Sequence, residues 1–211
     1  MSNPGLFITL EGVDGCGKTT QATLLVEDLE SEGHEVVRLR EPGGTRISEK
    51  IRLFVLDPQY DEMCDECELL LYEAARAQLV REVIEPALER GAVVVCDRFY
   101  DSTYAYQASA RGLSANVVSM ANNLGSCGLA PDLTIVFDLD PFEALKRATH
   151  EATDRVEGEG TEFQRKVRDG YLKLAQDEPH RVRIVDATGP VEVVHARVRQ
   201  TLSEGLDGGW G

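Results

Sequence analysis

Short, almost continuously hydrophobic runs recur along the chain, separated by longer stretches in which leucine returns at helical spacing. Such runs are typical of strands buried on both faces of a parallel sheet. We expect strands over residues 6–10, 35–39, 92–96, 133–138 and 182–185. We expect helices over residues 18–32, 47–56, 66–85 and 191–202, the third ending before Pro86 because proline breaks helical hydrogen bonding. The alternation predicts an α/β fold of three layers, with the sheet flanked by helices.

The 211 residues contain no internal repeat and no linker, which indicates a single domain over residues 1–204. One irregular charged stretch, residues 149–160, has no hydrophobic face. We expect a short lid there, at about residues 147–160. The glycine-rich end, residues 205–211, is expected to be a flexible tail.

The charge balance excludes several classes of partner. Acidic residues outnumber basic ones by 37 to 22, giving a formal net charge of −15. Such a surface repels nucleic acid and anionic membranes, so we expect neither as a partner. No hydrophobic run approaches the roughly 20 residues of a membrane-spanning helix. Residues 1–4 lack the basic and hydrophobic regions of a signal peptide, and we therefore expect a cytoplasmic protein.

Five cysteines are spread along the chain, an odd number that does not indicate a disulfide framework. Cys64 and Cys67 have the spacing of a metal-ligand pair. No second pair and no nearby histidine completes a four-ligand site, so we expect ordinary reduced thiols at both positions.

The strongest motif follows the first predicted strand and opens the first predicted helix. It matches G-x-x-x-x-G-K-S/T and consists of Gly12, Val13, Asp14, Gly15, Cys16, Gly17, Lys18 and Thr19. In such a loop, glycines let successive backbone N–H groups point at one anion, and the helix start adds its positive dipole end. Lys18 would neutralise the β- and γ-phosphates, and Thr19 would hold Mg²⁺. A glycine-rich turn without a ligand is the simpler alternative, but it needs neither the lysine nor the threonine.

The loop predicts nucleotide binding without identifying the group that receives the phosphate. A GTPase would carry an N-K-x-D guanine-binding motif, which is absent. After the third predicted strand the sequence reads Asp97, Arg98, Phe99, Tyr100 and not D-x-x-G. Sites of α/β sheets commonly lie at strand ends, where Arg98 could clamp a phosphate and Asp97 could hold Mg²⁺ through water. The carboxylate of Asp14, so close to phosphates, suggests contact with Mg²⁺ or a substrate hydroxyl.

Together these motifs resemble the thymidylate kinase family, whose members phosphorylate dTMP with ATP. The resemblance covers nearly the whole chain and rests on several segments in the right order: residues 11–20, 40–45, 74–76, 97–99, 102–107, 131–133 and 154–157. It implies a five-stranded parallel sheet, a homodimer and a lid that closes over ATP. It also implies in-line attack by a dTMP oxygen on the γ-phosphate of MgATP, a step in dTTP synthesis.

The resemblance assigns the ATP side of the site. It places ATP on the loop from Gly12 to Thr19 and on Thr20, with Thr19 and Asp97 at the metal. Some members of the family carry an arginine after the loop acid, but here that position is Gly15. The resemblance therefore implies that the lid supplies the catalytic arginine. We expect Arg155 in that role, beside Lys18, Arg98 and Asp97, and we expect Arg147 to pack on adenine.

The resemblance assigns the dTMP side as well. It implies that Asp14 binds the 3′-hydroxyl, that Arg98 clamps the phosphate, and that Tyr106 lies under the sugar and rejects ribose. Arg76 is expected to bond a thymine carbonyl, and Tyr72, four residues earlier on the same helix face, is expected to stack on the base. The resemblance also places Thr103 and Gln107 near the base edge. Arg40 and Arg52 are weaker candidates for the phosphate, with a solvent-facing arginine as the alternative at both positions. Glu41 and Pro42 fit a rigid turn, with a cis bond as one option.

Two alternatives to a dTMP kinase stay open at this point. The first is another P-loop kinase that acts on a deoxynucleoside or on a different monophosphate. The second is a P-loop ATPase that acts as a regulatory switch. Each assigned side chain also has a structural alternative, such as a solvated loop acid at Asp14 or a core aromatic at Tyr72.

Overall fold

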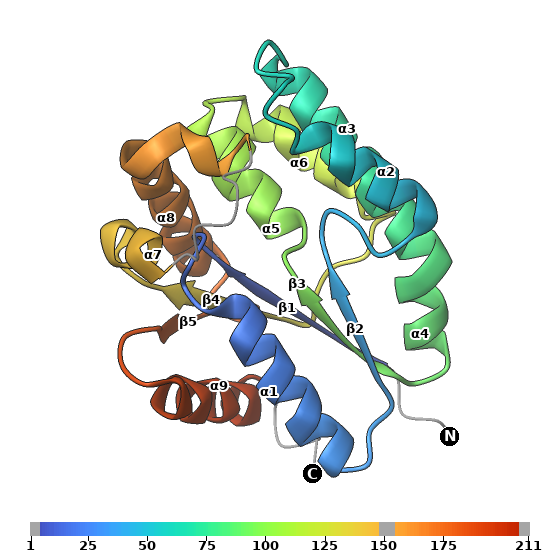
Figure 1. Cartoon of the computed structure of the whole chain (residues 1–211). Coiled ribbons are helices and arrows are strands. Elements are labelled where there is room, and N and C mark those ends of the chain that lie inside the picture. Colours follow the sequence, from blue (N-terminus) through green and yellow to red (C-terminus); the bar gives the residue numbers. More distant parts are fainter. Residues whose placement is uncertain (1–4, 148–154, 207–211) are drawn as a thin grey trace.

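The computed structural model describes residues 5–147 and 155–206. Its centre is a five-stranded, entirely parallel sheet with the strand order β2-β3-β1-β4-β5 (Figure 1). The strands are β1 (Leu6–Gly12), β2 (Val36–Arg40), β3 (Val93–Asp97), β4 (Leu133–Asp138) and β5 (Val182–Asp186). The prediction of a parallel sheet flanked by helices is confirmed.

The register of the sheet brings the ends of the central strands together. Leu10 of β1 pairs with Asp97 of β3, and Gly12 pairs with Phe137 of β4. All strands run in the same direction, so the segments that follow β1 and β3 leave the sheet at the same edge. The three central strands are buried as the hydrophobic runs predicted, with every residue of β1 buried. The prediction is wrong for the edge strands β2 and β5, which are only partly buried because each has a neighbouring strand on one side alone. The sheet is therefore a rigid base for two neighbouring loops.

Helices cover both faces of the sheet. They are α1 (Lys18–Ser31), α2 (Arg46–Val55), α3 (Asp65–Leu79), α4 (Glu85–Glu89), α5 (Tyr100–Thr103), α6 (Ala115–Gly125), α7 (Pro141–Arg147), α8 (Gly160–Asp177) and α9 (Val191–Gly205). Helices α1 and α9 lie against each other below the sheet in Figure 1, and α5 and α8 lie above it. Among the described residues, none of these helices combines the length and hydrophobicity needed to cross a membrane.

The predicted end of the third helix is wrong. Helical backbone continues from α3 through a π-helical segment, η1 (Val80–Ile84), into α4. The backbone N–H of Glu85 donates to the carbonyl of Val80, so the hydrogen-bond ladder shifts by one residue just before Pro86. Pro86 then falls in the first turn of α4, directly after the π-helical segment that has already interrupted the i→i−4 hydrogen-bond pattern.

Several helices were not predicted, among them α5 and α8, which lie above the sheet in Figure 1. A short helix, α5, runs into a second π-helical segment, η2 (Tyr104–Ala110), and α8 follows the expected lid. Helix α8 is rich in charge, but Val167, Tyr171 and Leu174 recur at helical spacing and are buried. That spacing was a usable signal for the helix.

The expected lid lies partly outside the described residues, which omit residues 148–154. Its last residues differ from the expectation of a stretch without a hydrophobic face. Val156 is buried in the main hydrophobic core, and Gly160 already begins α8. This end of the predicted lid is therefore packed structure.

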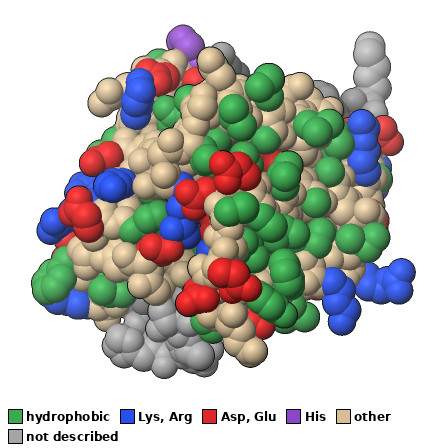
Figure 2. All heavy atoms as spheres, turned by 90° about the horizontal axis from the view of Figure 1, so that it is seen from above, with side chains coloured by type: hydrophobic (Ala, Val, Ile, Leu, Met, Phe, Trp, Pro, Cys, Tyr) green, Lys and Arg blue, Asp and Glu red, His purple; other side chains and the backbone are tan. Residues whose placement is uncertain are grey.

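Three adjacent helices, α2, α3 and α6, carry a group of exposed hydrophobic side chains. We call this group the exposed hydrophobic face; it consists of Leu53, Leu70, Val117, Met120 and Leu124. Leu124 is 77% exposed and Met120 is 67% exposed, which is unusual for residues of this size. Seen from above, hydrophobic side chains gather on the half of the molecule that carries α2 and α3 (Figure 2).

Candidate active site

The loop between β1 and α1 has the backbone that its glycines predict. Gly12, Gly15 and Gly17 have φ values of 140°, 80° and 100°, a region that residues with a side chain rarely enter. At Gly12 space is also limiting, because a Cβ atom would lie 2.7 Å from the carbonyl oxygen of Phe137. Gly17 is the N-cap of α1, so the loop ends at a helix N-terminus. This geometry suits the binding of a phosphate chain.

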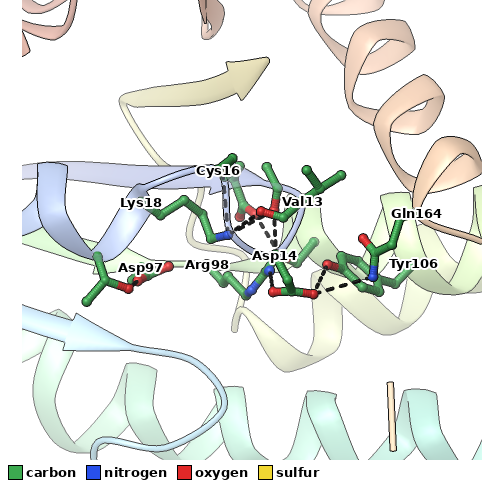
Figure 3. A network of polar contacts seen from close by, with 12 residues as sticks. Val13, Asp14, Cys16, Lys18, Asp97, Arg98, Tyr106 and Gln164 are labelled. Carbon is green, nitrogen blue, oxygen red and sulfur yellow. Dashed lines mark hydrogen bonds and ion pairs between the residues drawn. The ribbon is translucent and has the colours of Figure 1, made fainter. Parts of the chain in front are cut away.

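Lys18 lies across the loop and not away from it (Figure 3). Its Nζ donates to the carbonyls of Gly12 and Val13 at 3.1 and 2.9 Å. The side chain is buried, with only 6% exposed. The ammonium charge is thus held at the loop whose backbone N–H groups would surround a phosphate.

The two predicted metal ligands lie together. The hydroxyl of Thr19 donates to Asp97 Oδ2 at 2.8 Å, although 78 residues separate the two in sequence. Both are hard oxygen ligands, which Mg²⁺ prefers, and Mg²⁺ commonly takes its other ligands from water and phosphate. The described residues contain no group of three or more His, Cys, Asp or Glu side chains placed to hold a metal. The site therefore fits a metal that arrives with its nucleotide.

Arg98 follows β3 and turns back toward the loop. Its backbone has a φ of 73°, a left-handed conformation that is unusual for a residue other than glycine. Its guanidinium donates to the carbonyl of Gly12 at 3.1 Å and to Ser102 and Tyr171 at 3.2 Å each. A further bond goes to Asp14 Oδ1 (Figure 3). Lys18 and Arg98 therefore meet at one acceptor, the carbonyl oxygen of Gly12.

Asp14 joins three parts of the site. Besides Arg98, it accepts a hydrogen bond from the hydroxyl of Tyr106 at 3.1 Å, and the guanidinium of Arg98 lies 5.2 Å from the centre of the Tyr106 ring. Burial disfavours its charge, but the positive charges of Arg98 and Lys18 outweigh this and lower the pKa of Asp14 to about 2. The loop acid is therefore ionised across the physiological range.

Glu11 is a buried acceptor that the sequence reasoning did not assign. It receives hydrogen bonds from the backbone N–H of Phe99, from Ser102 Oγ and from the Tyr171 hydroxyl at 2.7, 2.6 and 2.8 Å. Burial and the nearby charge of Asp101 raise the pKa of Glu11 to about 7, against the opposing charge of Arg98. Tyr171 comes from α8, 160 residues away, and nothing in the local sequence indicates that it reaches the site.

A cavity opens beside Arg98. Its lining residues are Glu41, Pro42, Tyr72, Arg76, Arg98, Phe99, Ser102, Thr103, Tyr106 and Gln107. Five of the side chains expected to bind dTMP, namely Tyr72, Arg76, Thr103, Tyr106 and Gln107, thus lie around one space with Arg98. The Glu41–Pro42 bond at its wall is cis, which confirms that option.

Arg76 is the most buried charged group in this cavity, with 2% exposed. Its Nε donates to Glu41 at 2.8 Å, its Nη1 to Glu73 at 2.5 Å and its Nη2 to Thr103 at 3.0 Å. Burial raises the pKa of Glu41 to about 8, although the charge of Arg76 opposes this. One buried oxygen of each carboxylate, Glu41 Oε1 and Glu73 Oε2, has no partner among the described residues. Three side chains therefore fix the guanidinium in place, and one oxygen of each carboxylate is left to accept a further hydrogen bond.

Gln107 connects this cavity to the start of α3. Its amide nitrogen donates to Glu68 Oε1 at 2.7 Å. Glu68 is only 1% exposed and also accepts hydrogen bonds from Arg111 and Arg155. The carboxylate of Glu68 thus joins a cavity-lining amide to two arginines.

Arg147 lies where a donor nucleotide would extend from the loop. It lines a cavity of about 540 Å³ together with Asp14, Lys18, Thr19, Thr20 and Gly189. Its Nη1 donates to the carbonyl of Ala187 at 3.0 Å. Arg147 therefore lines the cavity that opens at the phosphate-binding loop.

Arg155 and Arg52 do not lie at the loop. Arg155 donates through its backbone N–H to Leu56, through Nε to Val55, and through Nη2 to Glu68. Arg52 donates to the carbonyl of Pro42 at 3.0 Å. Arg40 pairs with Glu49 at the surface. Sequence position did not reveal that carboxylates and carbonyls elsewhere in the fold hold these guanidinium groups.

A glycine-rich loop at the carboxyl edge of a parallel sheet, a lysine over that loop and a Thr–Asp pair define the class of P-loop nucleotide-binding proteins. A sequence model of the thymidylate kinase family matches residues 10–198 of the chain. The chain belongs to the thymidylate kinase family.

Individual relatives agree over nearly the full length. A thymidylate kinase from Caldanaerobacter subterraneus subsp. tengcongensis is 48% identical over 204 residues, 97% of this chain and 98% of that protein. One from Desulfosudis oleivorans is 50% identical over 205 residues, 93% of this chain and 96% of that protein. The crystal structure of thymidylate kinase from Ehrlichia chaffeensis has a TM-score of 0.77 and 33% identity, and the match covers 94% of this chain and 99% of that one.

The raised pKa of Glu11 predicts a pH dependence of stability. The folded protein binds this proton more tightly than the unfolded chain, whose glutamate has a pKa of 4.5. The resulting stabilisation is present below pH 4.5 and is lost as the pH rises through about 7. Between pH 5 and pH 8 the wild type should lose about 2–3 kcal/mol that Glu11→Gln does not lose.

Chemical unfolding of both proteins at the two pH values measures this difference. Glu27→Gln, at an exposed position on α1, is the matched control and should follow the wild type. The same pH dependence in the wild type and in Glu11→Gln would contradict the predicted shift.

Proposed function

We propose that this protein transfers the γ-phosphate of ATP directly to dTMP, giving dTDP and ADP, a step in dTTP synthesis. One observation carries the proposal: Lys18 and Arg98 both donate to the carbonyl oxygen of Gly12, each at 3.1 Å. Two cations that meet at one atom can hold two phosphates facing each other. The cavity lined by Arg147 and the phosphate-binding loop then lies on one side of this point. The cavity beside Arg98 lies on the other.

On the donor side, the loop amides and Lys18 bind the phosphates of ATP, and Arg147 packs beside its base. Thr19 and Asp97 hold Mg²⁺, which supplies charge neutralisation at the β- and γ-phosphates when bound. The contact between Thr19 and Asp97 supports this pairing.

On the acceptor side, Arg98 clamps the phosphate of dTMP and Asp14 accepts the 3′-hydroxyl. Tyr72 stacks on thymine, Arg76 bonds a thymine carbonyl, and Thr103 and Gln107 contact the base edge. The shared cavity of these side chains supports the assignment. Because Glu41, Glu73 and Thr103 hold Arg76 in place, its remaining N–H groups are pre-oriented for a carbonyl.

The reaction needs positioning and charge neutralisation more than it needs a base. The acceptor phosphate is already largely ionised at neutral pH, so no strong general base is required. Lys18 and Arg98 supply positive charge at the transferring group. For Arg155 to add a third charge, as proposed from the family resemblance, it would have to leave Glu68, its present partner. Arg52 would contribute at the phosphate only by leaving the carbonyl of Pro42.

The two alternatives make different predictions in one experiment. ADP release is measured in a coupled assay with dTMP, dUMP, UMP, thymidine and no acceptor, with and without Mg²⁺. The proposal expects turnover with dTMP, much less with UMP, and loss of activity when EDTA removes the metal. A deoxynucleoside kinase would turn over thymidine, whereas an ATPase switch would release ADP equally without an acceptor. Equal turnover on dTMP, UMP and no acceptor would defeat the proposal.

Arg98→Ala tests the phosphate clamp. Removing a partly buried guanidinium that anchors an anion should lower kcat/KM for dTMP by at least about 100-fold. Arg90→Ala, the same change at an exposed arginine paired with Glu35, should leave the kinetics unchanged. Steady-state kinetics with dTMP varied at saturating ATP measures both. Wild-type kinetics in Arg98→Ala would overturn the clamp.

Tyr106 tests how the site selects deoxyribose. A ring packed against C2′ would reject a ribose hydroxyl by steric exclusion. Tyr106→Ala should reduce the preference for dTMP over its ribose counterpart by at least about 10-fold. Tyr106→Phe keeps the ring and loses only the hydrogen bond to Asp14, so it should keep the preference. The measurement is the ratio of kcat/KM for dTMP to kcat/KM for its ribose counterpart, in the wild type and in both variants. An undiminished ratio in Tyr106→Ala would remove the ring from sugar selection.

We also propose that the protein is a cytoplasmic homodimer. The exposed hydrophobic face, spread over three adjacent helices, supports the dimer, because soluble monomers rarely expose so many large hydrophobic side chains together. A second copy of the chain would cover this face.

Leu124→Glu tests the dimer. A charge within a hydrophobic interface should give a monomer in light scattering at micromolar concentration. Val193→Glu, at an exposed hydrophobic position on α9, should leave the mass of the particle unchanged. A wild type that is monomeric, or a Leu124→Glu dimer, would contradict this interface.

A further inference from the structure

Cys64 and Cys67 stand apart from the other cysteines. All five cysteines are free and lie within the described residues. Cys16 and Cys96 are buried and Cys127 is half-buried, whereas Cys64 and Cys67 are both exposed. The two fully exposed thiols are therefore the two that are three residues apart.

The pair lies at the N-terminus of α3. Cys64 is the N-cap, with extended backbone angles of −71° and 155°, and Cys67 is in the first turn. The N–H of Glu68 donates to the carbonyl of Cys64 at 3.0 Å and closes this turn. Residues three apart on a helix have Cβ atoms about 5–6 Å apart, and a disulfide needs about 3.5–4.5 Å. Cys64 accepts the first helical hydrogen bond through its carbonyl, but its own φ and ψ angles are extended and not helical. A change in these two angles can bring its Cβ atom closer to that of Cys67.

The same turn is connected to the candidate active site. Glu68, the residue after Cys67, accepts hydrogen bonds from Gln107 at 2.7 Å and from Arg111 at 3.1 Å. Arg155 donates to the same carboxylate. Gln107 also lines the cavity assigned to the acceptor base. A change in the first turn of α3 therefore reaches that cavity through one buried side chain.

We propose that Cys64 and Cys67 form a reversible dithiol–disulfide site, and that its oxidation weakens binding of the acceptor nucleotide. The second half of this statement rests on the proposed function, whereas the first half does not. Closing the disulfide draws the N-cap toward Cys67 and displaces Glu68 from its three partners. Gln107 then loses the contact that orients its amide toward the cavity.

The chemistry is thiol–disulfide exchange with a small disulfide. One cysteine thiolate attacks a sulfur of RS–SR, forms a mixed disulfide and expels one RS⁻. The second thiolate attacks the cysteine sulfur of that mixed disulfide, forms the Cys64–Cys67 bond and expels the second RS⁻. Two protein thiols are thereby oxidised and one RS–SR is reduced to two RSH.

The surroundings select the charge of the oxidant. Asp61, Glu62 and Glu66 are exposed beside the pair, and Asp65 lies between the two cysteines. Arg111 is 3.5 Å from Asp65 but is mainly engaged by Glu68 and Glu159. The local charge is negative, so a cationic disulfide should approach faster than an anionic one.

The first test follows the thiols of the full-length native protein. Cystamine, a cationic disulfide, should remove two reactive thiols without leaving an adduct, and peptide mapping should find a Cys64–Cys67 bond. Cys64→Ser and Cys67→Ser should each retain a mixed disulfide on the remaining cysteine. Oxidised glutathione, which is anionic, should react at least about tenfold more slowly at low salt, and molar salt should reduce that ratio. A stable adduct on the wild type, or no reaction at either cysteine, would overturn the proposal.

The second test measures the connection to the site. Oxidation of the wild type should raise KM for dTMP at least about fivefold, and dithiothreitol should restore it. Cys64→Ser and Cys67→Ser cannot form the bond. After the same treatment, their KM for dTMP should stay at the value of the dithiol form. A disulfide that forms without changing KM would refute the coupling. If the reduced protein does not phosphorylate dTMP, the proposed function fails, and the thiol measurement still decides whether the disulfide forms.

Discussion

The ion pair between Arg98 and Asp14 joins the end of β3 to the phosphate-binding loop, and much of the site depends on it. Arg98 adopts left-handed backbone angles, which cost on the order of 1–2 kcal/mol for a residue with a side chain. Bonds to the loop carbonyl, Ser102, Tyr171 and Asp14 offset this cost. Asp14 also reduces repulsion between Arg98 and Lys18. Because the pKa of Asp14 is about 2, this connection persists at any physiological pH.

A second constraint is the concentration of buried carboxylates around few guanidinium groups. Arg76 lies between Glu41 and Glu73, and Glu11 is buried against hydroxyl and N–H donors. Burial of such groups is expensive and rarely adds stability compared with a hydrophobic core. Their value lies in geometry, since each fixes a side chain that faces a cavity. The protein holds Glu11 and Glu41 with raised pKa values, and this lowers its stability as the pH rises through neutrality.

The parts of the site that could be predicted share a physical reason. Strand ends at one edge of a parallel sheet must lie together, so Thr19 and Asp97 meet despite their separation in sequence. Tyr72 and Arg76 share a cavity because they are one helical turn apart. The positions of Arg155 and Tyr171 could not be predicted, because neither a strand end nor helical spacing relates them to the loop. Which partner each one reaches depends on how α2, α3 and α8 pack, and no local pattern encodes that packing.

By itself, the sequence determined the class of fold, the phosphate-binding loop and the residues that gather around it. Hydrophobic periodicity and loop chemistry are local properties, read over a few residues at a time. Only the tertiary structure decided that Arg98 folds back onto Gly12, that helical backbone continues past Pro86, and that Glu68 binds the arginine expected at the phosphates. Each of these outcomes depends on which long-range contacts have the lowest free energy. That can be determined only when the whole fold is known.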